Sequence, residues 1–304
     1  MKTALRITGL FLFALAFASA EEVETYLRGG NMAFPAQALT SPRFSGEDYY
    51  WGGEVRLVQP IEPGIDLTLG LLRDPALGNL VYSGVSYRDN FFSLGAGPVY
   101  SFLNNDDLSL QPGVRADFSL QWPGRLLAQG EVMGSLGNRL RNPGDYSQFY
   151  NRFSLGLHLP NVLLRLEFSE KSALFLSDGG MEQETAVTDY GFVTEIFQKN
   201  IPYRVTLGFF YRQIKDIRTQ TALSPVENQS QKLNALILQT RGEWDITPSF
   251  TLMADLLSGV FAFGTFDDYS AANSEVSLKL PSQFPQNYLF ELSLGCRYRF
   301  TREE

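Results

Sequence analysis

The sequence has little of what disulfide-bonded domains, metal sites and helical membrane proteins need. Its 304 residues include one cysteine, Cys296, and one histidine, His158. A single cysteine forms no internal disulfide, and a transition-metal site needs a cluster of cysteines and histidines. Beyond the N-terminus, no apolar run approaches the roughly 20 residues that a membrane-spanning helix requires. We therefore expect no cofactor, no bound metal and no helical membrane domain.

Positive charge is also scarce. The chain has 25 lysines and arginines against 33 aspartates and glutamates, which gives a net charge of −8. An acidic balance disfavours nucleic acid as a partner, and it provides no polybasic segment for a membrane surface.

The N-terminus predicts export. Lys2 and Arg6 are followed by an apolar run over residues 9–16 and by the small residues of positions 18–20. This order is typical of a secretory signal peptide, with cleavage expected near Ala20. Loss of Lys2 and Arg6 changes the net charge from −8 to −10. Residues 21–304 show no linker and no shift in composition, so they are expected to form a single domain.

The last stretch of the chain alternates between apolar and polar side chains, with Leu289 as the only apolar exception on the polar side. In a strand, this period of two places the apolar set on one face and the polar set on the other. Aromatic residues lie at both ends of the apolar face and aliphatic residues lie between them, as in a strand that crosses a bilayer. The apolar set is Tyr288, Phe290, Leu292, Leu294, Cys296, Tyr298 and Phe300, and the opposite face carries Glu291, Ser293, Gly295, Arg297 and Arg299.

The same stretch resembles the C-terminal signature of bacterial outer-membrane β-barrel proteins. The resemblance is carried by Ser293, Gly295, Cys296, Tyr298 and Phe300, which stand at the offsets of that signature. It implies a place in the bacterial outer membrane, in contact with its lipid, and docking on the barrel-assembly machinery during insertion. The chain departs from the pattern by continuing through residues 301–304 beyond the final aromatic.

Upstream, alternating segments of about ten residues follow one another almost without pause. About thirteen are clear, and a weaker one around Val23 and Leu27 makes about fourteen, with twelve as the alternative. Short turns marked by proline or asparagine alternate with longer polar loops, expected at residues 35–48, 137–147, 177–184, 219–230 and 266–284. The pattern predicts an all-β fold: an antiparallel, transmembrane, up-and-down β-barrel. A soluble all-β sandwich is the alternative, because a strand with one face on a core and the other in water also alternates between apolar and polar residues.

The face opposite the lipid is expected to carry paired charges, in which arginine greatly outnumbers lysine. These residues either line a water-filled pore that sorts solutes, or pair across strands and fill the barrel. A barrel of about fourteen strands is too wide for side chains alone to fill, which favours the pore. The expected pore-lining residues are Arg56, Arg115, Asp117, Glu131, Arg152, Arg165, Glu167, Arg204, Arg241, Glu243, Asp255, Glu291 and Arg297.

Catalysis is not expected. His158 is predicted on the lumen side near the periplasmic rim. Outer-membrane phospholipases carry a histidine and a serine two residues apart on the lipid face, and no such pair occurs here. Omptin-like proteases need an acidic residue and a histidine at the external end, which is the end opposite to His158. The length and strand number resemble those of monomeric outer-membrane porins, which implies passage of small solutes. Transporters of hydrophobic substrates are a second resemblance, although too few residues precede the first strand to form their plug. A structural or adhesive surface barrel is the remaining alternative.

Overall fold

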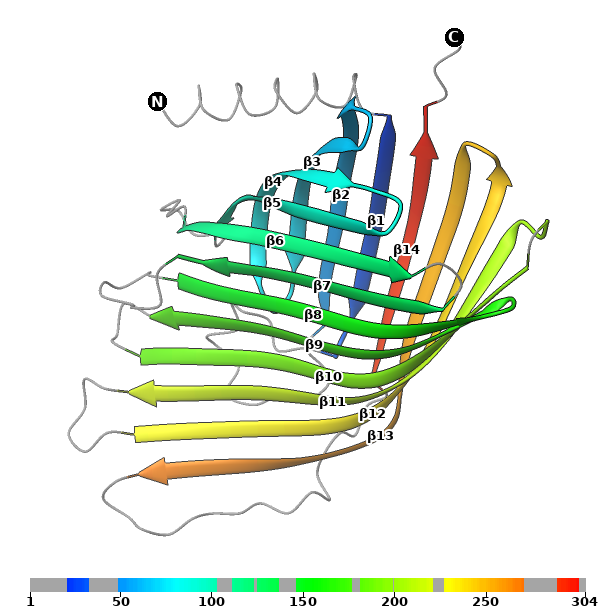
Figure 1. Cartoon of the computed structure of the whole chain (residues 1–304). Coiled ribbons are helices and arrows are strands. Elements are labelled where there is room, and N and C mark those ends of the chain that lie inside the picture. The colour runs from blue at the N-terminus through cyan, green and yellow to red at the C-terminus, as the bar shows by residue number, and fades with distance from the viewer. Residues whose placement is uncertain are drawn as a thin grey trace.

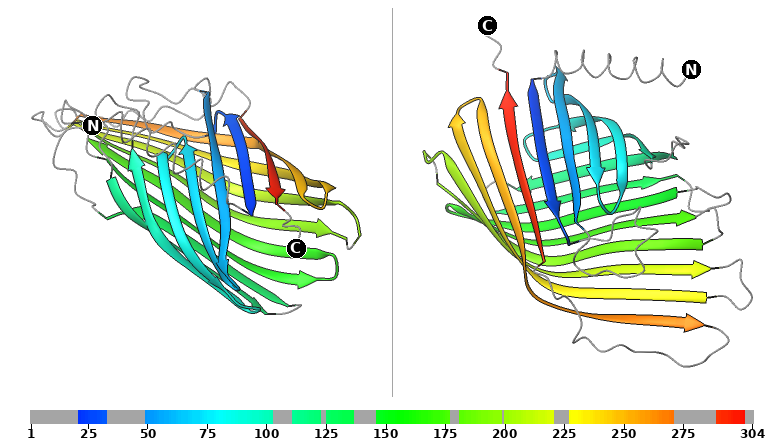
Figure 2. Two further views of the ribbon diagram at one scale, coloured as in Figure 1. Left: turned by 90° about the horizontal axis from the view of Figure 1, so that it is seen from above. Right: turned by 180° about the vertical axis from the view of Figure 1, so that it is seen from behind.

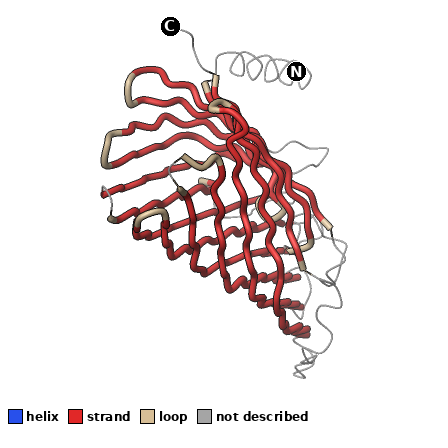
Figure 3. Tube along the Cα trace, turned by 90° about the vertical axis from the view of Figure 1, so that its right-hand side faces the viewer, coloured by secondary structure: helices blue, strands red, loops and turns tan. Residues whose placement is uncertain are grey.

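The computed structural model describes residues 21–32, 49–102, 111–122, 125–136, 146–176, 181–198, 200–220, 227–270 and 289–300. Figure 3 shows strands and short connections among these residues. This part of the chain contains no helix that is long and apolar enough to cross a membrane. The predicted signal peptide, the loop at residues 35–48 and the tail at residues 301–304 lie outside the described residues. The strands are β1 (Glu22–Gly30), β2 (Tyr50–Glu62), β3 (Ile65–Asp74), β4 (Gly78–Arg88), β5 (Phe92–Phe102), β6 (Gln111–Trp122), β7 (Leu126–Ser135), β8 (Tyr146–Leu159), β9 (Val162–Leu176), β10 (Met181–Phe197), β11 (Tyr203–Gln220), β12 (Glu227–Thr247), β13 (Phe250–Ser270) and β14 (Phe290–Arg299).

All fourteen strands belong to one closed antiparallel barrel (Figure 1). Each strand pairs with its neighbours in the chain, and β1 pairs with β14 from Glu22↔Arg299 to Gly30↔Glu291. Closure matters because an open sheet edge leaves backbone N–H and C=O groups without partners in lipid. The prediction of fourteen strands is confirmed. It depended on the weak N-terminal segment, which is the strand that closes the barrel.

The connections divide the barrel into two ends. Six tight connections lie at one end, here called the short-turn end, and they join β2 to β3, β4 to β5, β6 to β7, β8 to β9, β10 to β11 and β12 to β13. The first residue of β1 and the last residue of β14 lie at the same end. Three of these turns contain a residue with positive φ, namely Gly64, Asn161 and Asn200. Glycine and asparagine are the residues that adopt this conformation most readily, which explains the asparagines in the predicted turns. The opposite end is called the long-loop end below.

The outer face carries a band of exposed apolar side chains between two belts of aromatic residues. A surface of this kind is stable in a bilayer, with aliphatic chains in the hydrocarbon and rings at the headgroup level. The barrel is therefore transmembrane. Exposed aromatics at the short-turn end include Tyr87, Trp122, Tyr203, Trp244 and Tyr298, those at the long-loop end include Trp51, Tyr100, Phe149, Tyr190 and Phe261, and aliphatics between them include Leu155, Leu166, Leu207, Leu256 and Leu292.

The barrel wall is taller on one side. Strands β10 to β13 contain 17 to 21 residues, whereas β1 and β3 contain 9 and 10. Figure 2 shows the long strands continuing past the others on one side of the barrel. Beyond the aromatic belt, most outward positions of β10 and β11 are polar, and Gln213 donates a hydrogen bond to Asn234 across β11 and β12 at 3.1 Å.

Four predicted loops were partly wrong at this end. Strand pairing covers parts of residues 137–147, 177–184, 219–230 and 266–284, because β8 begins at Tyr146, β10 at Met181 and β12 at Glu227, and β13 ends at Ser270. The error has a physical cause. Where a strand leaves the membrane, its outer face no longer has to be apolar, so the alternation that marks a strand disappears while backbone pairing continues.

Candidate functional site

The inward faces of the strands gather the predicted charged residues around the lumen. A cavity of about 440 Å³, called the chamber here, is lined by Arg56, Arg115, Glu131, Arg152, Glu167, Arg241, Asp255 and Glu291. A second cavity of about 710 Å³, toward the short-turn end, is lined in part by Asp117. Arg56 and Arg115 line both cavities, so the two adjoin. Arg165, Arg204, Glu243 and Arg297 do not line the chamber, but ion pairs link them to residues that do, in the case of Arg204 through Glu243.

The arginines pair with carboxylates on the same or neighbouring strands. Arg152 on β8 contacts Glu167 on β9 at 2.9 Å, and Arg165 contacts the same carboxylate at 3.1 Å. The predicted pair of Arg165 with Glu167 is thus confirmed. Equivalent pairs join Arg115 to Glu131 at 2.8 Å, Arg56 to Glu24 at 2.8 Å, Arg204 to Glu243 at 2.9 Å, Arg241 to Glu243 at 2.6 Å and Arg297 to Glu24 at 3.5 Å.

Three chamber carboxylates instead accept hydrogen bonds from neutral side chains. Glu54 accepts from Tyr26 at 2.6 Å and from Tyr82, Glu291 accepts from Tyr50, and Asp255 accepts from Gln239 at 2.7 Å. Sequence reasoning missed this role for tyrosines, since the ring was read as a marker of the lipid boundary.

The contact between Tyr82 and Glu54 depends on a glycine. Tyr82 lies on β4 and Glu54 on β2, so the ring must cross the intervening strand β3. It crosses at Gly70, where an added Cβ would lie 2.1 Å from the Tyr82 ring. A glycine in a strand interior often marks such a close approach.

A further group of side chains spans the lumen, and the sequence analysis did not predict it. Asp74, at the end of β3, contacts Arg28 on β1 at 2.5 Å and Lys171 on β9 at 2.7 Å. The side chain of Asp74 is 1% exposed. Next to it, the Tyr146 hydroxyl on β8 donates a hydrogen bond to the carbonyl oxygen of Leu77. The connection between β3 and β4 is therefore folded into the barrel and held against its other side.

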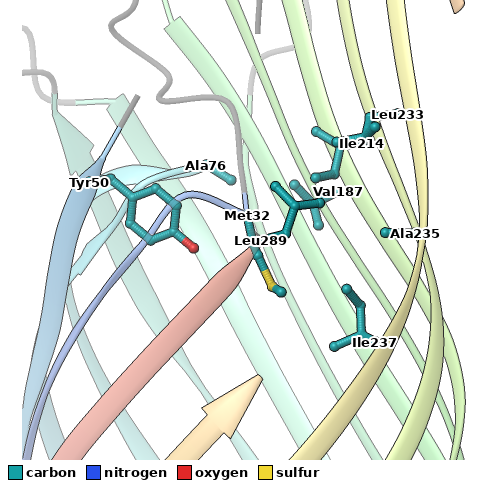
Figure 4. Packing of buried hydrophobic residues seen from close by; sticks show 9 residues of the cluster. All are labelled: Met32, Tyr50, Ala76, Val187, Ile214, Leu233, Ala235, Ile237 and Leu289. Atoms are coloured by element: carbon teal, nitrogen blue, oxygen red, sulfur yellow. The ribbon is translucent and has the colours of Figure 1, made fainter. Parts of the chain in front are cut away.

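Apolar side chains surround this inward turn. Leu77 packs with Leu80, Tyr82, Val99 and Met133. Ala76 belongs to a second cluster, in which Tyr50, Met32 and Leu289 approach the inner wall formed by β10 to β12 (Figure 4). The wall side of that cluster consists of Val187, Ile214, Leu233, Ala235 and Ile237. In the described part of the barrel, the lumen is charged along the chamber and apolar around the turn.

The single cysteine and the single histidine both lie within the strand ladder. Cys296 on β14 lies 3.4 Å from the Thr25 hydroxyl of β1, on the outward parity of both strands. His158 lies on the inward parity of β8, and its backbone N–H donates to the carbonyl of Arg125 at 2.8 Å. Among the described residues, no group of three histidines, cysteines or carboxylates could hold a metal ion.

Known protein structures resemble this chain in overall fold and show little sequence identity with it. No protein-family model matches the chain, and no curated protein matches it. An outer membrane channel from Pseudomonas putida F1 is 10% identical, with 92% of this chain and 96% of that chain covered and a TM-score of 0.48. OmpT, an outer membrane protein of Vibrio cholerae, is 9% identical, with 92% and 95% covered and a TM-score of 0.39. The CymD monoaromatic hydrocarbon channel is 10% identical, with 95% and 91% covered and a TM-score of 0.37. By its own closed register and aromatic belts, the chain is a 14-stranded antiparallel transmembrane β-barrel, and its structural neighbours are outer-membrane channels and porins.

Proposed function

We propose that this protein is a channel of the bacterial outer membrane that passes small polar or ionic solutes through its arginine- and carboxylate-lined lumen. One observation carries the proposal: the adjoining cavities of about 440 and 710 Å³ are lined by ion pairs. The predicted arginines of these pairs keep part of their surface open to water, with side-chain exposures that range from 15% for Arg115 to 51% for Arg152. A row of partly hydrated charges around a lumen creates the field by which channels sort ions.

A filled, structural or adhesive barrel is the second candidate. The inward turn at Asp74 and the apolar cluster around Met32 favour it, because both occupy the lumen near the long-loop end. The two candidates differ in what the charges do. In a hydrated lumen, an ion pair is screened and contributes about 0–1 kcal/mol. In a dry lumen, removal of one partner leaves a buried charge and costs about 3–5 kcal/mol.

Replacement of a chamber arginine should therefore change selectivity more than stability. We expect Arg241→Ala to shift the reversal potential in a salt gradient toward cations, because it removes one positive charge from the lumen while Glu243 keeps its pair with Arg204. The free energy of unfolding should fall by about 0–1 kcal/mol. Planar bilayers and urea titration in micelles measure the two quantities.

The matched control is Lys215→Ala, which removes one positive charge from the outward face of β11, where Lys215 pairs with Glu184 at 3.3 Å. It should leave the reversal potential unchanged. A loss of about 3–5 kcal/mol in Arg241→Ala, together with silent bilayers, would favour the filled barrel.

We also propose that β14 is the segment through which the barrel-assembly machinery takes up the chain. Tyr298 and Phe300 form an edge-on ring pair with centroids 4.7 Å apart at the short-turn end of this strand. Phe300→Ala and Tyr298→Ala should each slow insertion, whereas deletion of residues 301–304 should not. Pulse-chase labelling with heat-modifiable gel mobility follows the process. An essential tail combined with a dispensable Phe300 would exclude this role.

A further inference from the structure

We propose that the turn between β3 and β4 is a gate of the lumen, held shut by ion pairs that Asp74 makes with both sides of the barrel. The gate turn is defined as Asp74, Pro75, Ala76 and Leu77. The inference rests on the proposed channel function and names the element that would regulate it.

The ion pairs of Asp74 join parts of the barrel that are far apart in the sheet. Its Oδ2 atom lies 2.5 Å from Arg28 on β1 and 2.7 Å from Lys171 on β9. Strand β9 is six strands from β1 in one direction around the barrel and eight in the other. These partners are therefore not neighbours in the sheet, and a single carboxylate bridges the lumen between them.

The other oxygen of Asp74 shapes the turn itself. Oδ1 accepts hydrogen bonds from the backbone N–H groups of Ala76 at 2.8 Å and Leu77 at 3.1 Å, and Gly78 follows with a φ of +80°. An aspartate that binds the backbone two and three residues later is a common turn-former. The two tasks are thus divided between two oxygens. Asparagine at this position keeps an oxygen acceptor for the turn and loses the negative charge that pairs with Arg28 and Lys171.

Apolar side chains complete the closure. Leu77 is 1% exposed among residues of β4, β5 and β7, and Ala76 is 2% exposed in the cluster of Ile214 and Leu233 on β11 and β12. A hydrophobic constriction of this kind stops ions by excluding water. Asp74, Pro75, Ala76 and Leu77 all line the chamber, so the gate turn borders the charged part of the lumen directly.

The contacts of the gate turn with β8 and β9 run through side chains. They include Lys171 to Asp74 and Tyr146 to the Leu77 carbonyl, whereas the backbone pairing that closes the barrel involves β3 and β4 only up to Asp74↔Gly78. Release of these side chains would free the turn without breaking the described strand ladder. The proposed switch is thus a movement of the turn alone, with the strand ladder intact.

The first test compares open probability in planar bilayers. Asp74→Asn should raise the fraction of time spent open about tenfold over the wild type, because the shift follows the lost stabilisation of the closed state. Lys171→Met removes only the ion pair between Asp74 and β9, and it should also raise the fraction of time spent open. The matched control is Glu184→Gln, which breaks the outer pair with Lys215 and should change nothing.

A second measurement follows the turn itself. In a Cys296→Ser background, Ala76→Cys places the thiol at a position that is 2% exposed. A membrane-impermeant thiol reagent should label it about tenfold faster when Asp74→Asn or Lys171→Met is added.

The outcomes separate the gate from the channel. Conducting wild-type protein with unchanged labelling and open probability in both variants would overturn the gate and leave the channel in place. Faster labelling with silent bilayers in every variant would overturn both. Faster labelling with a raised open probability supports the gate.

Discussion

An arginine in place of Leu166 should lower the free energy of unfolding by about 2–4 kcal/mol, since a charge near the bilayer midplane loses its hydration. Leu166 lies on the outer face of β9 between the aromatic belts, and its side chain is 62% exposed on the protein. In a water-soluble sandwich, the same substitution at an exposed position would be nearly neutral. Urea titration in lipid vesicles measures the difference.

The control for Leu166→Arg is Thr188→Arg on β10. Thr188 lies on the outward face beyond the aromatic belt, and its two neighbours in the sheet, Glu170 of β9 and Gln213 of β11, are polar. We expect it to cost much less than Leu166→Arg. Equal losses at the two positions would contradict the placement of the membrane, and a folded protein that stays soluble without detergent would contradict the transmembrane barrel.

A methyl group at Gly295 should destabilise the seam between β14 and β1 by about 1–3 kcal/mol, the usual cost of overpacking. A Cβ at this position would lie 2.5 Å from the backbone oxygen of Thr25 and 2.7 Å from the Cβ of Tyr26. The backbone atom cannot move without shifting the register pair Tyr26↔Gly295. Equilibrium unfolding in micelles reports this cost separately from any effect on assembly in the cell.

Gly242→Ala provides the matched comparison, because no atom lies within 4 Å of a Cβ built at Gly242. It should be neutral or slightly stabilising. If Gly295→Ala were as stable as Gly242→Ala, glycine in the C-terminal signature would serve recognition alone. The structure instead predicts that the same residue also lets the two terminal strands approach.

The fold could be predicted because a membrane strand constrains each of its positions. Along β9, for example, Leu164 and Leu166 alternate with Arg165 and Glu167, and the two sets lie on opposite faces. Lipid imposes this pattern on one face of every strand, so strand number and direction can be read from a single sequence. The prediction failed where lipid imposes nothing, at the start of β8 and in the extensions of β10 to β13 beyond the membrane.

The site was predictable only in part, and for a related reason. Pairs on adjacent strands, such as Arg152 with Glu167, follow from register once the strand order is known. The contact of Lys171 with Asp74 spans 97 positions in the sequence and crosses the lumen. The alternation of residues along a strand cannot predict such a contact, because the contact depends on the direction in which one short turn folds.

The current through single wild-type molecules in a planar bilayer tests the central claim, a hydrated and charged lumen, most directly. We expect discrete steps in symmetrical potassium chloride and, under a salt gradient, a reversal potential that Arg241→Ala moves toward cations. Folded barrels that remain silent, both as wild type and as Asp74→Asn, would contradict the claim and leave a filled barrel.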